Sequence, residues 1–130
     1  DIFYHGNNSE ILIISSGPML HNCISASEYI KKEYNINIGI VDVPSYKPLN
    51  GSNLKKILKD NKTVFSIEDH MIQGGLGSLI AETMSEMNLN NNLFIKGLDS
   101  FVGSGMPKDL EKRYSLDSMS IVKFILDRIN

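Results

Sequence analysis

Short aliphatic runs alternate with segments of helical periodicity along this chain, and that alternation limits its possible folds more than any other feature. The runs lie at 11–16 (ILIISS), 36–43 (INIGIVDV), 62–69 (KTVFSIED) and 93–98 (LFIKGL). Continuous apolar runs of this length are typical of strands that are buried on both faces. Strands that alternate with helices pair in parallel through right-handed crossovers. The sequence therefore predicts an α/β fold, a three-layer α/β/α sandwich around a mostly parallel sheet.

The segments between the runs carry helix signals. Pro18 suits the first turn of a helix, Ser52 or Asn53 can cap a short helix at 54–60, and Asp117 can cap the last one. A further helix is expected from Pro107 to Arg113. Three apolar faces at helical spacing are expected to pack on the sheet, namely Leu20, Cys23, Ile24 and Ile30, then Leu76, Leu79, Ile80, Met84 and Met87, and finally Val122, Ile125, Leu126 and Ile129.

The first five residues, DIFYH, alternate between apolar and polar and precede a turn-like GNNSE. They predict an extra strand at the edge of the sheet, which could be antiparallel to the others.

Composition excludes several classes of function. The 130 residues suffice for one domain, 1–130, and the hydrophobic fraction of 42% and charged fraction of 22% are those of a soluble globular protein. A net charge of −2 argues against nucleic acid or an anionic membrane as the main partner. One cysteine fits a reducing, cytoplasmic compartment, and no apolar run approaches the roughly 20 residues of a membrane span. The start without Met suggests a piece of a longer protein.

Glu68, Asp69 and His70 fall at the carboxyl end of a predicted parallel strand, where open α/β sheets bind ligands. Neighbouring side chains on an extended chain point to opposite faces, so Glu68 and Asp69 are poorly placed to work as one acid–base pair. We therefore interpret the trio as a structural turn or an interface, with a carboxylate that accepts backbone N–H bonds. Catalysis by Glu68 and His70 is the competing hypothesis.

Five residues shortly after this trio, Gly74, Gly75, Leu76, Gly77 and Ser78, form a candidate anion-binding turn. No Lys-Ser or Lys-Thr follows the glycines, so this is not a Walker A loop, and Ile80 stands where a dinucleotide fingerprint has its third glycine. Free N–H groups at the start of the following helix attract anions. We favour the alternative hypothesis that the glycines allow close helix–strand packing. Anion binding at this turn stays as the second hypothesis.

The remaining reactive residues predict no catalytic or metal site. His5 and His21 are isolated in sequence and lack partners at metal-ligand spacing. Cys23 lies on an apolar helix face and is interpreted as a small core residue. Ser15 to Gly17 lack the G-x-S-x-G arrangement of a hydrolase. The turn SGMP at 104–107 is interpreted as a plain helix cap.

Four segments, in this order, resemble the C-terminal domain of transketolases, including the C-terminal part of split transketolase subunits. They are ILIISSG, IGIVDVPSYKPLN, TVFSIEDHMIQGGLGSLIAE and FVGSGMPKDLEKRYSLDSMSIV. The third is the most specific, with its acidic-His turn and its Gly-Gly-x-Gly-Ser. Two departures are modest: Asn50 replaces an Asp, and Val102 separates Phe101 from the following glycine.

The resemblance implies a five-stranded mixed sheet with one antiparallel strand. It also implies that thiamin diphosphate, Mg²⁺ and the reacting sugar bind in other domains, across a homodimer, and that this chain holds no cofactor of its own. The parent enzyme would be a transferase of the pentose phosphate pathway that moves two-carbon ketol units between sugar phosphates. This chain would support subunit geometry beside the cofactor-binding domains of the same enzyme.

Three alternatives stay open. The chain could be a regulatory module that binds an anion or nucleotide near Gly77. It could also be the equivalent domain of a deoxyxylulose-phosphate synthase or of a 2-oxoacid dehydrogenase β subunit, although FVGSG and RYSLD favour transketolase over both.

Overall fold

A computed structural model describes residues 3–5, 10–43, 51–71, 75–98 and 116–129. For residues 3–5, 51–54, 69–71 and 98, the description is limited to the backbone. Pro44, Pro48 and Gly51 predict a loop at 45–52, of which 45–50 lie outside the described residues. Gly74, the FVGSG and SGMP turns and the helix expected from Pro107 lie outside them as well.

Helices and strands alternate along the described chain. Their order is β1 (Phe3–His5), β2 (Ile11–Ser15), α1 (Met19–Tyr34), β3 (Ile38–Asp42), α2 (Gly51–Asp60), β4 (Thr63–Met71), α3 (Leu76–Glu86), β5 (Asn92–Leu98) and α5 (Ser118–Ile129).

The sheet has five strands in the order β1-β3-β2-β4-β5. The strands β3, β2, β4 and β5 run parallel, with Ile13 of β2 between Ile40 of β3 and Phe65 of β4. The short β1 pairs antiparallel with β3, with Phe3 opposite Asp42. The predicted parallel sheet with one antiparallel edge strand is therefore confirmed.

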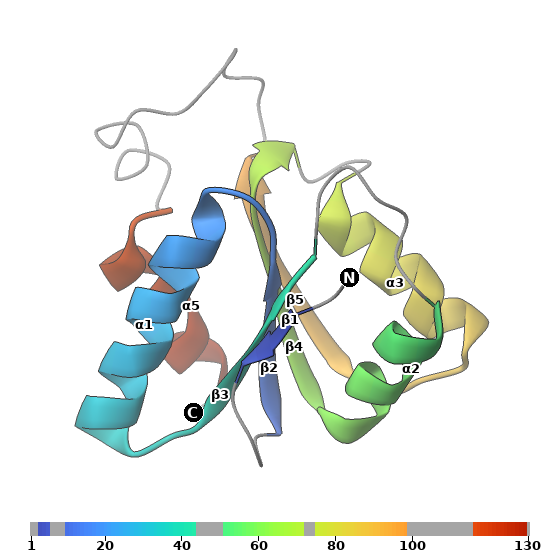
Figure 1. The fold of residues 1–130 in the computed structure, drawn as a ribbon, viewed down its shortest axis with the longest axis horizontal. Helices are drawn as coiled ribbons and strands as arrows, with labels where there is room; N and C mark the ends of the chain where they lie inside the picture. Colours follow the sequence, from blue (N-terminus) through green and yellow to red (C-terminus); the bar gives the residue numbers. More distant parts are fainter. Residues whose placement is uncertain (1–2, 6–9, 44–50, 72–74, 99–115, 130) are drawn as a thin grey trace.

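Helices cover both faces of the sheet (Figure 1). The helices α1 and α5 lie on one side and α2 and α3 on the other, so the sandwich has three layers. Alternation along β2 explains this, because Ile13 enters the core under α1 and α5 while Leu12 and Ile14 enter the core under α2 and α3. The predicted α/β/α architecture is confirmed.

The helix expected at 54–60 begins earlier, at Gly51, so Ser52 and Asn53 lie inside α2 and the prediction that one of them caps it is wrong. Two further details concern α3 and α5. Leu79 was expected on the apolar face of α3, but its side chain is 43% exposed, and the buried positions are Gly77, Ile80 and Met84. A glycine at a buried position carries no side chain to mark it as part of the helix face. The cap on α5 is as predicted, since an Asp117 carboxylate oxygen accepts the Ser120 backbone N–H at 3.4 Å.

Candidate functional site

The carboxyl end of β4 and the start of α3 form the candidate site. The strand is longer than predicted and continues through Glu68, Asp69 and His70 to Met71. Its pairing with β5 is irregular here, because Ile67 lies opposite Lys96 while Met71 already lies opposite Leu98. The three residues are therefore strand residues.

Glu68 is the best-defined side chain of the site. It is 2% exposed, and its Oε2 accepts the backbone N–H of Leu76 at 2.7 Å. Its Oε1 lies 3.5 Å from the Gly77 nitrogen, at the outer limit of a hydrogen bond. The glycine at the cap position of α3, Gly75, has no side chain that could accept these bonds. A carboxylate from a neighbouring strand therefore caps α3, where a negative charge is stabilised by the helix dipole.

This cap bears directly on the candidate anion site. Of the five residues Gly74 to Ser78, Gly74 lies outside the described part of the chain, while Leu76 and Gly77 donate their N–H groups to Glu68. An external anion would have to displace this carboxylate or bind beside it, and two close negative charges repel. Anion binding here stays a prediction, but the two N–H groups already have a negatively charged acceptor.

Gly77 also has a packing role. A Cβ at this position would lie 2.7 Å from Cγ2 and 2.8 Å from Cγ1 of Ile95 on β5. No real Cβ makes such short contacts, so only glycine lets the first turn of α3 approach β5 this closely. The close approach brings the N–H groups of α3 over the end of β4, where Glu68 meets them.

Asp69 and His70 are placed by their backbone alone. That Glu68 and Asp69 face opposite sides of the sheet stays a prediction, because the pairing of β4 with β5 shifts in register between Ile67 and Met71. An interface role for Asp69 and His70 stays a prediction.

The other reactive residues are dispersed. His21 is exposed on α1, whereas Cys23 is fully buried, and burial raises the pKa of its thiol to about 12. A thiol of this pKa is protonated near neutral pH and is a poor nucleophile. In the described part of the chain, no three His, Cys, Asp or Glu side chains come together as a metal-binding group. None of its described helices is long and apolar enough to cross a membrane.

A second charged cluster was not found from the sequence. The ammonium of Lys96 on β5 lies 4.9 Å from the ring centroid of Phe124 on α5, and the guanidinium carbon of Arg128 lies 3.7 Å from the same centroid. Phe124 and Arg128 are four residues apart on one helix, and this spacing could have indicated that their side chains are in contact. Nothing in the sequence indicated that β5 would bring Lys96 to the same ring.

Comparison with known proteins places these features in a family. Residues 4–121 match the family described as transketolase, C-terminal domain. A 1-deoxy-D-xylulose-5-phosphate synthase of Clostridium tetani is 32% identical over 92% of this chain and 19% of its own length. A putative transketolase C-terminal section of Methanocaldococcus jannaschii is 34% identical over 95% of this chain and 38% of its own length. One of the subunits of an apulose-4-phosphate transketolase from Actinobacillus succinogenes is 31% identical over 90% of this chain and 38% of its own length.

Solved structures agree with these matches in fold. A structure described as "Split gene transketolase, inactive beta4 tetramer" superposes with a TM-score of 0.84 at 24% identity and covers 98% of this chain and 41% of that one. A transketolase of Campylobacter jejuni superposes with a TM-score of 0.64 at 16% identity, over 96% of this chain and 18% of that one. The chain thus spans between 18% and 41% of the length of the proteins that it resembles.

Proposed function

The chain belongs to the family of transketolase C-terminal domains, and on that premise we propose that residues 1–130 form the C-terminal domain of a thiamin diphosphate-dependent transketolase. The parent enzyme transfers two-carbon ketol units between sugar phosphates in the pentose phosphate pathway, in the cytoplasm. The chain itself supports the geometry of the cofactor-binding domains and of a homodimer and carries out no chemistry.

One observation carries the assignment of chemistry to other domains. The N–H groups at the start of α3, which could bind a phosphate, are donated to the Glu68 carboxylate at the end of β4 instead. Because Glu68 is almost fully buried, it exchanges with an incoming anion only if the end of β4 and the start of α3 rearrange. The described residues therefore do not fit the diphosphate of the cofactor at this site, and we derive no step of catalysis through it.

The relatives support a domain that works as part of a larger assembly. Matched proteins include one transketolase subunit and a C-terminal section, which by their names are parts of an enzyme, and synthases about five times longer than the matched region. We propose that the partners of this chain are the cofactor-binding domains of the same enzyme, in one polypeptide or in a second one.

A second candidate is the equivalent domain of a 1-deoxy-D-xylulose-5-phosphate synthase. The identity to the Clostridium tetani synthase, 32%, is close to the 34% and 31% of the two transketolase relatives. Overall identity therefore does not separate the two activities. The FVGSG and RYSLD segments are the reason for preferring transketolase.

Calorimetry tests the assignment of the chemistry. We expect the 130-residue chain to take up no thiamin diphosphate in the presence of Mg²⁺, whereas the complete enzyme binds the cofactor. Saturable, tight uptake by the chain alone would overturn the proposal. Assays of the complete enzyme then separate the two candidates, because ketol exchange between sugar phosphates supports transketolase and formation of 1-deoxy-D-xylulose 5-phosphate supports the synthase.

A further inference from the structure

The strand β5 forms one edge of the sheet. It has seven residues, from Asn92 to Leu98, and among the described strands it pairs with β4 alone. Along the outer side of such a strand, alternate N–H and C=O groups point away from the sheet and can pair with a further strand. The opposite edge of the sheet ends in β1, which has three residues. The longer edge thus offers the larger template for strand addition.

Beside this edge two cations share one aromatic ring. Lys96 points from β5 to one side of Phe124, and Arg128 stacks on the ring at 3.7 Å while its Nη1 donates to the Phe124 carbonyl at 3.0 Å. Phe124 in turn packs edge-on against Phe65, with ring centroids 5.9 Å apart, and Phe65 stacks on Phe94 of β5. The aromatic residues therefore fix the two cations next to the open edge.

Among the described residues, neither cation forms an ion pair with a carboxylate. The ion pair on α5 joins Lys123 to Asp127, and no described carboxylate forms one with Lys96 or Arg128. Burial, and secondly the charge of Arg128, lower the pKa of Lys96, and Asp117 opposes this in part. The Asp117 carboxylate is itself bound by the N–H and the hydroxyl of Ser120. Two cations thus lie close together, and among the described carboxylates Asp117 opposes the lowering of the Lys96 pKa only in part.

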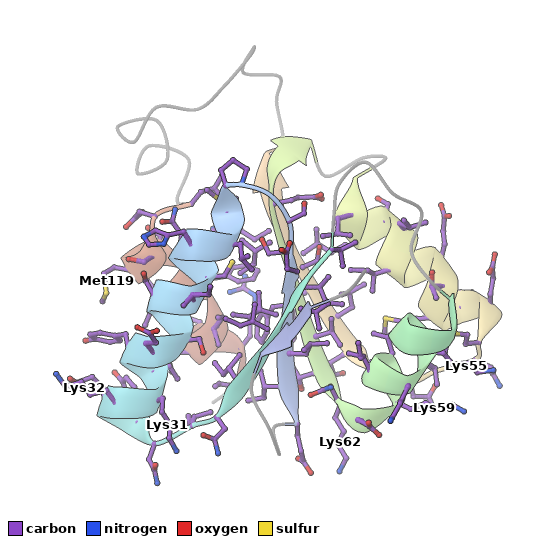
Figure 2. All side chains as sticks on the ribbon, in the orientation of Figure 1. Lys31, Lys32, Lys55, Lys59, Lys62 and Met119 are labelled. Carbon is purple, nitrogen blue, oxygen red and sulfur yellow. The ribbon has the colours of Figure 1, made fainter. Side chains whose placement is uncertain are left out.

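Five lysines elsewhere in the described part of the chain differ from Lys96 in their exposure to solvent. Figure 2 shows Lys31, Lys32, Lys55, Lys59 and Lys62 projecting outward at the end of the molecule where α1 finishes and β4 begins. All five are exposed, so water solvates their charges, whereas Lys96 is half-buried. Arg128 is exposed, so the cost of partial burial falls on Lys96, and an incoming anionic group beside Lys96 would relieve it.

We propose that β5, with Lys96, Phe124 and Arg128, is a docking surface for an extended acidic segment of the polypeptide that carries the cofactor-binding domains. The segment adds a strand along β5 and places a carboxylate beside the two cations, as opposite charges pair across neighbouring strands. A second copy of this chain in the same place would bring Lys96 and Arg128 against the same cations, and like charges disfavour that arrangement. The identity of the partner rests on the proposed function.

Hydrogen exchange followed by mass spectrometry tests this surface. We expect the β5 amides to exchange about tenfold or more slowly in the complete enzyme than in the 130-residue chain. The double variant Lys96→Gln, Arg128→Gln should raise β5 exchange in the complete enzyme about tenfold, because it removes two charge-assisted contacts. The control, Lys59→Gln on α2, removes an exposed positive charge elsewhere and should leave β5 exchange unchanged.

Several outcomes would overturn the docking surface. These are equal β5 exchange in the chain and in the complete enzyme, loss of protection in the Lys59→Gln control, or concentration-dependent self-association of the isolated chain that by itself protects β5. Thermal unfolding of the isolated variants identifies any loss of stability that would raise exchange indirectly. An activity assay separates this test from the test of the proposed function. A complete enzyme that protects β5 but does not transfer ketol units contradicts the proposed function and still supports the docking surface.

Discussion

Glu68 on β4 and Lys96 on β5 carry opposite charges on neighbouring strands, and they differ both in burial and in the groups that surround their charges. Glu68 is almost fully buried, yet its carboxylate accepts N–H groups at the start of α3. Lys96 is only half-buried, yet its nearest charged neighbour on Phe124 is another cation, Arg128. The degree of burial alone therefore does not indicate which of the two charges has hydrogen-bond donors or an opposite charge beside it. Among the described residues, the carboxylate at the end of β4 has its donors within the domain, whereas Lys96 has no ion-pair partner, and we propose that a partner meets this charge along β5.

Replacing Glu68 should cause the largest loss of stability. Glu68→Ala leaves the Leu76 and Gly77 N–H groups buried without an acceptor, and we expect the free energy of unfolding to fall by about 2–3 kcal/mol. Glu68→Gln keeps an oxygen acceptor but loses the negative charge at the helix start, so it should cost about 1 kcal/mol. Urea denaturation measures both. Equal losses for the two variants, or no loss in either, would contradict the capping role.

A side chain at Gly77 should have the next largest effect. Gly77→Ala forces a Cβ against Ile95, a cost of about 1–3 kcal/mol that the higher helix propensity of alanine offsets by about 1 kcal/mol. We expect a net loss of up to about 2 kcal/mol by urea denaturation. In the background of Ile95→Ala, which removes the clashing atoms, Gly77→Ala should cost less. If Gly77→Ala cost the same in both backgrounds, contact with Ile95 would not be the reason for the glycine.

The smallest expected effect is a pH dependence at Lys96. Its pKa in the folded chain lies below the ordinary value of 10.5, because burial and then Arg128 disfavour the charged form. Between the folded-state pKa and 10.5 the unfolded chain binds more protons, so the free energy of unfolding should rise with pH in that window. As the pH rises through this window, the unmodified chain should gain stability relative to the Lys96→Gln variant, whose side chain at 96 does not titrate. Chemical denaturation at a series of alkaline pH values measures the difference, and a relative loss would contradict the account.

Much of the fold could be predicted from local patterns. The aliphatic runs gave the four parallel strands, and the order of the motifs gave the family, because both depend on residues close in sequence. Asp117 was recognised as a cap for the same reason, since it lies three residues before the N–H that it accepts. The extension of β4 to Met71 was missed because it depends on pairing with Leu98 of β5.

The candidate site was less predictable because its contacts cross between elements. The sequence indicated that a carboxylate near residues 68–69 would accept backbone N–H groups, but it did not tell which carboxylate or which N–H. That choice depends on Glu68 facing the α3 side of β4 and on Gly77 letting α3 approach β5. The cation pair on Phe124 was missed altogether, since it requires β5 and α5 to lie side by side.

The central claim is that the end of β4 supplies its own anion and needs no ligand. Amide NMR of the 130-residue chain tests it most directly, in separate titrations with millimolar inorganic phosphate and with thiamin diphosphate and Mg²⁺. Because Glu68 already accepts their N–H groups, the amide signals of Leu76 and Gly77 should not move in either titration. Saturable shifts of these two signals at low ligand concentration would show that an external anion takes the place of Glu68, and the account would be wrong.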